Sequence, residues 1–110
     1  MLEIPVGIDE NDYTIEFEAE EFSVVIHMRW NSEANLWIAG LQTLDGAPIV
    51  YGLPVLHCRF MLDPYSGLEG VPPGDLVAMS DKGRNPERDS FLDGSARLYY
   101  LTKAENAALQ

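Results

Sequence analysis

The feature that most restricts the fold of this chain is a regular alternation of apolar and polar side chains. Between residues 13 and 18, Tyr, Ile and Phe alternate with Thr and Glu, and a period of two continues from Phe22 to Trp30. Successive side chains of a β-strand point to opposite faces, whereas a helix needs a period of about 3.6. The two segments therefore predict two strands, each with one face on an apolar core.

Turn-forming residues divide the rest of the sequence into further short strands. Residues 31–35 favour a turn, and Asp45-Gly46 is a strong hairpin signal because both residues tolerate a positive φ. Residues 63–74 contain three glycines and three prolines and are expected to form a long ordered loop. Further strands are expected at residues 36–44, 49–53, 55–62, 76–79 and 96–101. The pattern predicts an all-β fold, a small antiparallel β-barrel or sandwich-like domain with long Pro/Gly loops.

The length of the chain is typical of one domain. We expect a single β domain over residues 1–110, in which residues 1–12 form an N-terminal arm and residues 103–110 a short C-terminal tail. No apolar run approaches the roughly 18 residues that a membrane-spanning helix needs, and the N-terminus lacks the features of a signal peptide. Cys58 is the only cysteine, so no internal disulfide can form. These observations favour a cytosolic origin and no membrane partner.

Negative charge is concentrated at the start of the sequence. The formal net charge is −11, and the first 22 residues contain eight of the 18 acidic residues but no Lys or Arg. Such a segment repels phosphate backbones, which argues against nucleic acid as a partner. It favours a protein with a basic surface, and the candidate contact residues are Glu16, Glu18, Glu20 and Glu21. The alternative is that these carboxylates only protect an edge strand from unwanted pairing.

The sequence shows no convincing constellation for catalysis or metal binding. His57 and Cys58 are adjacent, so in a strand their side chains would point to opposite faces and could not form a nucleophile–base pair. His27 lies on the polar side of its predicted strand. Two histidines and one cysteine without motif spacing are a weak zinc signal, and no calcium-loop pattern is present. We therefore expect no enzyme activity, no cofactor, no metal and no small-molecule substrate.

Aromatic residues have two possible uses in this sequence. Tryptophan in a strand usually packs in the core or across strands. The alternative is an exposed stacking platform, which would make the chain a non-viral carbohydrate- or peptide-binding β module. The first interpretation predicts a core that includes Val24, Ile26, Trp30, Trp37, Ile38, Leu98 and Tyr100.

The Pro/Gly-rich loop is the second candidate contact surface. Its prolines reduce the conformational entropy that is lost on docking, and its apolar side chains are more than a lone domain requires. The candidate interface residues in this loop are Tyr65, Leu68, Val71, Pro72 and Pro73. The alternative is that the loop folds back and caps one end of the domain.

Four motifs in order carry a resemblance to a known family. Met28–Asn31 ends one predicted strand, and Leu44–Gly46 leads into the next. Val71–Leu76 follows, and finally Asp89–Gly94 runs into Ala96–Leu101. This order resembles the baseplate plug family of bacteriophages with contractile tails, over about residues 17–101. The chain differs in a longer insertion before the paired prolines and in a more acidic N-terminal strand.

The resemblance implies a structural protein of the virion, without catalytic residues. Such a protein is assembled into the tail baseplate, and is made and assembled in the host cytoplasm. Its implied partners are other baseplate, hub, spike or tail-tube proteins, with several copies in each assembly.

Overall fold

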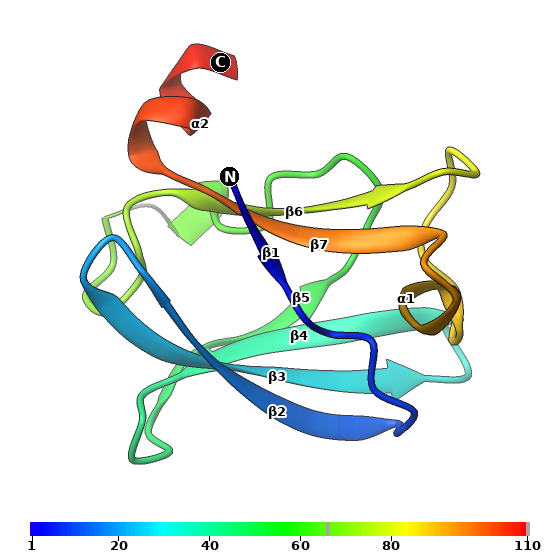
Figure 1. Ribbon diagram of the computed structural model, residues 1–110. Coiled ribbons are helices and arrows are strands. Elements are labelled where there is room, and N and C mark those ends of the chain that lie inside the picture. The colour runs from blue at the N-terminus through cyan, green and yellow to red at the C-terminus, as the bar shows by residue number, and fades with distance from the viewer. Residues whose placement is uncertain (66, 110) are drawn as a thin grey trace.

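The computed structural model describes residues 1–65 and 67–109, which form two antiparallel β-sheets with three short helical segments (Figure 1). The strands are β1 (Leu2–Ile4), β2 (Asp12–Ala19), β3 (Phe22–Asn31), β4 (Leu36–Gln42), β5 (Pro48–Pro54), β6 (Asp75–Ser80) and β7 (Ala96–Leu101). The helical segments are the 3-10 turn η1 (Asp63–Tyr65) and the α-helices α1 (Ser90–Asp93) and α2 (Lys103–Leu109).

The two sheets face each other as the layers of a sandwich (Figure 1). The four-stranded sheet has the order β2-β3-β4-β5, so consecutive strands are joined by hairpins. The three-stranded sheet has the order β1-β7-β6, which places the first strand of the chain beside the last. The all-β prediction is confirmed in its sandwich-like form, because the strands form two separate sheets and do not close into one barrel.

The core lies between the sheets and is built by the predicted alternation. Along β3, Val24, Ile26 and Met28 are at most 3% exposed, while the residues between them face outwards. Leu76 and Leu98 close the core from the three-stranded sheet, and both are fully buried. Burial of a large aliphatic side chain contributes about 1.5–3 kcal/mol, so these two inner faces are the main source of stability.

Five of the seven expected core residues are buried in the structure, and two are half-buried. Buried members are Val24, Ile26, Trp37, Leu98 and Tyr100. Trp30 is half-buried and packs on the core from the rim. The expectation for Ile38 is corrected: it is half-buried on the outer face of β4, opposite Arg29. Its neighbour Trp37 faces the core, and two successive strand residues cannot face the same side.

Two of the expected elements differ in the structure. The N-terminal arm contains β1, which pairs with β7 in register Leu2↔Tyr100. The strand expected at residues 55–62 is absent, and residues 57–61 instead run irregularly along the free edge of β6. Cys58 donates its N–H to Ala78 O, at 2.9 Å, and has a left-handed φ of 57° that breaks strand geometry. An alternating pattern reports burial of a face, but it does not guarantee a hydrogen-bonded ladder.

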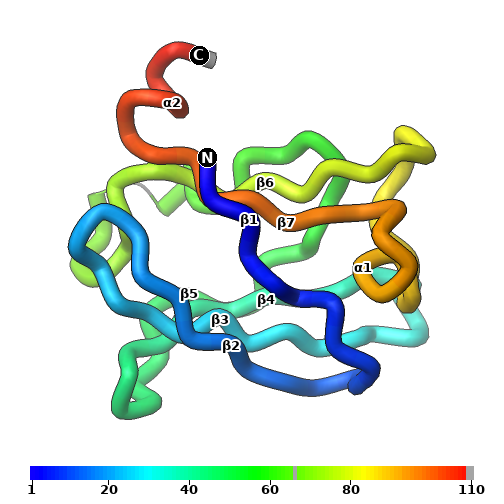
Figure 2. The backbone as a smooth tube through the Cα atoms, viewed as in Figure 1, coloured from blue at the N-terminus to red at the C-terminus, as the bar shows by residue number. Residues whose placement is uncertain are grey.

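The N-terminus lies beside α2 (Figure 2). The amino group of Met1 forms an ion pair with the Glu105 carboxylate in α2, at 2.7 Å. This contact lowers the pKa of Glu105 to about 2, because the carboxylate accepts a hydrogen bond from the ammonium group. The predicted C-terminal tail therefore contains a short helix, which an ion pair joins to the amino group of Met1, just before β1.

Candidate protein-interaction surfaces

The Pro/Gly-rich loop folds partly back onto the sandwich. Val71 is 7% exposed and belongs to the core, and Pro72 is buried beside it. Tyr65 is half-buried and packs against the same core. Leu68 is 54% exposed, and Pro73 is also exposed. The loop thus has an inner side, which caps the core, and an outer side, which is available for contact.

The C-terminal end of this loop is fixed by a close backbone approach. A Cβ atom on Gly74 would lie 1.8 Å from the carbonyl oxygen of Leu101, so only glycine fits at this position. The Gly74 N–H also donates to the Tyr100 hydroxyl at 2.8 Å. The loop therefore leaves the sheet in one defined direction.

Asp75 fixes the loop from inside the protein. Its side chain is buried, and Oδ1 accepts hydrogen bonds from the backbone N–H groups of Leu62, at 2.6 Å, and Leu76, at 2.8 Å. Its Oδ2 has no hydrogen-bond partner among the residues that the structure describes. Burial raises the pKa of this carboxyl group, and the nearby Asp63 adds to the effect. One buried carboxyl group thus connects both ends of the loop.

The acidic residues of β2 and its turn divide into two groups. Glu16 and Glu18 point outwards from an edge strand of the four-stranded sheet and are exposed. Glu20 and Glu21 form the hairpin turn, with φ of 49° and 72°. The Glu20 carboxylate accepts hydrogen bonds from the Tyr100 hydroxyl, at 2.7 Å, and from the Lys103 N–H, at 3.0 Å. All four are exposed, but the Glu20 carboxylate is bound to Tyr100 and Lys103, whereas Glu16, Glu18 and Glu21 make no such contact with the other sheet in the residues the structure describes.

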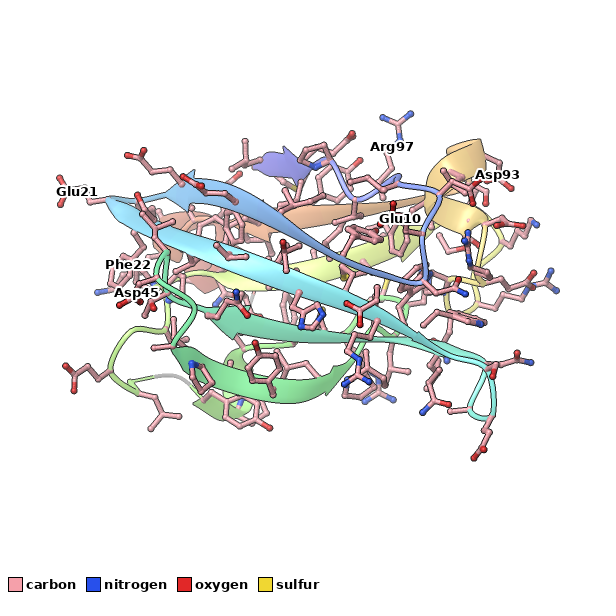
Figure 3. All side chains as sticks on the ribbon, turned by 90° about the horizontal axis from the view of Figure 1, so that it is seen from below. Glu10, Glu21, Phe22, Asp45, Asp93 and Arg97 are labelled. Carbon is pink, nitrogen blue, oxygen red and sulfur yellow. The ribbon has the colours of Figure 1, made fainter. Side chains whose placement is uncertain are left out.

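The outer face of the four-stranded sheet carries many polar and charged side chains (Figure 3). His27 Nε2 is hydrogen-bonded to the Asp12 carboxylate, and the His27 ring packs edge-on against Tyr51 at 6.1 Å. Tyr51 covers Gly40, where a Cβ atom would lie 2.1 Å from the ring. Side chains on this face are therefore held in place by contacts between neighbouring strands.

His57 and Cys58 are closer than strand geometry allows, and that expectation is corrected. Cys58 Sγ lies 3.4 Å from His57 Nε2, because residues 57 and 58 are not in a regular strand. The other ring nitrogen, Nδ1, accepts a hydrogen bond from the Ser80 N–H at 3.0 Å. In a neutral imidazole the proton then sits on Nε2, so the ring donates towards the sulfur and does not accept a proton from it.

Across residues 1–65 and 67–109, no three His, Cys, Asp or Glu side chains are grouped closely enough to hold a metal ion. Within the same residues, no helix has both the length and the apolar character needed to cross a membrane. Trp37 is 1% exposed, so it cannot serve as a stacking platform, and the half-buried Trp30 contacts it edge-on at 5.5 Å.

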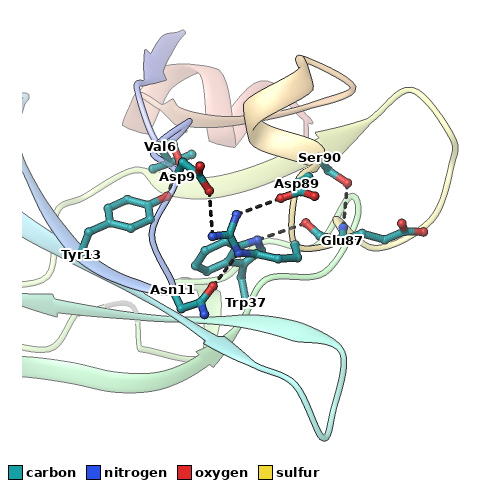
Figure 4. A network of polar contacts seen from close by, with 9 residues as sticks. Val6, Asp9, Asn11, Tyr13, Trp37, Glu87, Asp89 and Ser90 are labelled. Carbon is teal, nitrogen blue, oxygen red and sulfur yellow. Dashed lines mark hydrogen bonds and ion pairs between the residues drawn. The ribbon is translucent and has the colours of Figure 1, made fainter.

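A polar network around Arg88 was not predicted from the sequence (Figure 4). The Arg88 guanidinium donates to Asn11 Oδ1 at 2.5 Å, to Asp9 at 3.1 Å and to Asp89 at 2.9 Å. It also lies over the Trp37 ring, 5.9 Å from the ring centre. Asp9 and Asn11 lie nearly 80 residues before Arg88 in the sequence, so their contacts with it leave no periodic pattern. The only sequence signal was an arginine in a polar loop. It fixes the N-terminal segment over the end of the core.

The fold is a small two-sheet β-sandwich with one anchored loop, and charged side chains are prominent on the outer face of its four-stranded sheet. The family model described as Cyanophage baseplate Pam3 plug gp18 matches residues 1–103. The chain belongs to this family of phage baseplate plugs. No curated protein matches it. Membership supports a structural role in a virion tail baseplate, alongside other baseplate proteins.

Proposed function

We propose that the chain is a plug subunit in the centre of a contractile-tail baseplate, where several copies bind hub, spike or tail-tube proteins. The observation that carries this proposal is the family match, which spans residues 1–103 of 110. Synthesis and assembly take place in the host cytoplasm. The protein acts through its surfaces and not through catalysis.

The outer side of the Pro/Gly-rich loop is the first proposed contact. Leu68 is exposed at the turn of the loop, and Pro73 is exposed close to its anchored end. Val71 and Pro72 hold the loop from below, so they support the contact without touching the partner. A loop that is already ordered loses little entropy on docking, which suits assembly from small, separately made subunits.

The accessible carboxylates of the β2–β3 hairpin are the second proposed contact. Glu16, Glu18 and Glu21 form an acidic edge that complements a basic groove on a neighbouring protein. Such charges increase the rate of encounter, and salt screens them over about 8–10 Å at physiological ionic strength. Their contribution to assembly is therefore expected to weaken as the salt concentration rises.

A matched pair of substitutions tests the loop. Leu68→Asp places a charge at the proposed contact, and Leu44→Asp places the same charge on a leucine of similar exposure, 56% against 54%. Both variants should melt within a few degrees of the native chain, since surface changes alter stability by about 0.5 kcal/mol. Only Leu68→Asp should fail to enter tails when it replaces the native chain during phage assembly. Equal incorporation of the two variants would refute the contact.

A further inference from the structure

A second apolar surface lies on the outer face of the three-stranded sheet. A groove of about 570 Å³ runs over β6 and β7 on the side that faces away from the core. Val77 and Leu101 form its floor and are nearly buried, while Met79 is 43% exposed and Met1 67% exposed at its walls. A sheet that already buries one apolar face in a core does not need apolar side chains on the other face.

A neighbouring depression extends this groove. Cys58 and Phe60 line both hollows, and Arg59, between them in the sequence, lines the second one, of about 390 Å³. The edge-covering segment at residues 57–61 therefore forms the ridge between two apolar hollows. The two hollows share Cys58 and Phe60 in their linings, so they form one continuous surface.

Two ion pairs lie near this surface, and the Asp63 carboxylate lines the second hollow together with Arg59. The Met1 amino group is paired with Glu105, and Arg97 is paired with Glu3 at 3.0 Å. Arg59 is different: in the part of the chain that the structure describes, it has no ion-pair partner, whereas every other arginine there has a carboxylate within 4 Å. In a chain with a net charge of −11, a guanidinium without an ion pair at the edge of an apolar hollow offers a positive group to a partner's carboxylate, even with Asp63 in the same hollow.

We propose that this surface docks an apolar segment of another baseplate protein, which places a carboxylate against Arg59. The proposal rests on the proposed function as a plug subunit and adds a face and a partner chemistry to it. Apolar side chains of the partner fill the groove over Val77 and Leu101, and the carboxylate forms a bidentate pair with the guanidinium. The carboxylates of the β2–β3 hairpin face a basic partner, so the two surfaces select neighbours of opposite charge.

Three single variants test this surface during tail assembly in place of the native chain. Met79→Asp puts a charge in the groove, and Leu92→Asp puts the same charge on a leucine of similar exposure in α1, 39% against 43%. Arg59→Glu reverses the unpaired charge. We expect incorporation of Met79→Asp and Arg59→Glu into purified tails to fall at least about tenfold, with melting temperatures close to native. Leu92→Asp should be incorporated normally.

The possible outcomes distinguish a failure of the docking surface from a failure of the proposed plug role. Normal incorporation of Met79→Asp and Arg59→Glu overturns the docking surface while leaving the plug role intact. Absence of the native chain from purified tails overturns the plug role itself. Sedimentation of the purified native chain identifies the remaining alternative: a dimer that Met79→Asp converts to a monomer would assign the groove to a second copy and overturn the proposed partner. A native chain that sediments as a monomer supports it.

Discussion

Replacement of Trp37 by alanine tests how much the stability of the core depends on one aromatic ring. The ring is 1% exposed and contacts Tyr13, Trp30 and Phe91 edge-on at centroid distances of 5.8, 5.5 and 6.5 Å. Truncation of a buried tryptophan costs about 3–5 kcal/mol, through lost transfer free energy and the cavity left behind. In a domain of this size that corresponds to a fall in melting temperature of at least about 12 °C.

A second substitution divides this loss into its parts. Trp37 donates its indole N–H to the carbonyl oxygen of Glu87 at 3.2 Å, and Trp37→Phe removes this hydrogen bond but keeps most of the packing. The expected loss for Trp37→Phe is about 1–2 kcal/mol. Equilibrium unfolding in urea measures both variants, and Leu44→Ala, at an exposed leucine, should change the free energy by less than about 0.5 kcal/mol. A loss below about 1 kcal/mol for Trp37→Ala would refute the reasoning.

Two further predictions concern the anchored end of the Pro/Gly-rich loop. Gly74→Ala should lower the free energy of unfolding in urea by about 1–3 kcal/mol or more, because its Cβ meets the rigid carbonyl of Leu101; an unchanged midpoint would contradict the close approach. Asp75 has a raised pKa in the folded protein, so its burial penalty applies at neutral pH and is relieved as the pH falls through that raised pKa. As the pH is lowered from about 7 to about 4, the free energy of unfolding of the native chain should therefore rise relative to that of Asp75→Asn, as measured by chemical denaturation. A relative fall over the same range would mean that the pKa is lowered in the folded protein.

The sequence predicted strands correctly where one face of the strand is apolar and the other is polar. The segment from Phe22 to Trp30 alternates over its whole length, and it forms β3 with the predicted inner face. Residues 96–101 likewise form β7 with the expected bounds. Residues 55–62 also suggested a strand, yet they cover an edge without pairing regularly. Sequence pattern reports which side chains are buried, and hydrogen-bond geometry is decided by the neighbouring strand.

The candidate contact residues were harder to predict, because exposure depends on how a loop folds. Val71 and Pro72 are apolar in the same way as Leu68, but only Leu68 remains well exposed. The Asp75 carboxyl group bonds the backbone at both ends of the loop, and its burial leaves no pattern in the sequence. The groove over β6 was missed for a related reason: Val77 and Met79 were assigned to a short strand without a second apolar face.

Glu20 has a mechanical consequence for a protein that works inside a tail. Its carboxylate joins the tip of the β2–β3 hairpin to the last strand and to the first residue of α2. A pull on α2 is therefore shared directly between both sheets at one end of the sandwich, without passing through the apolar layer. Substitution of Glu20 would therefore change how such a force is shared between the two sheets, while leaving the packing of the core unchanged.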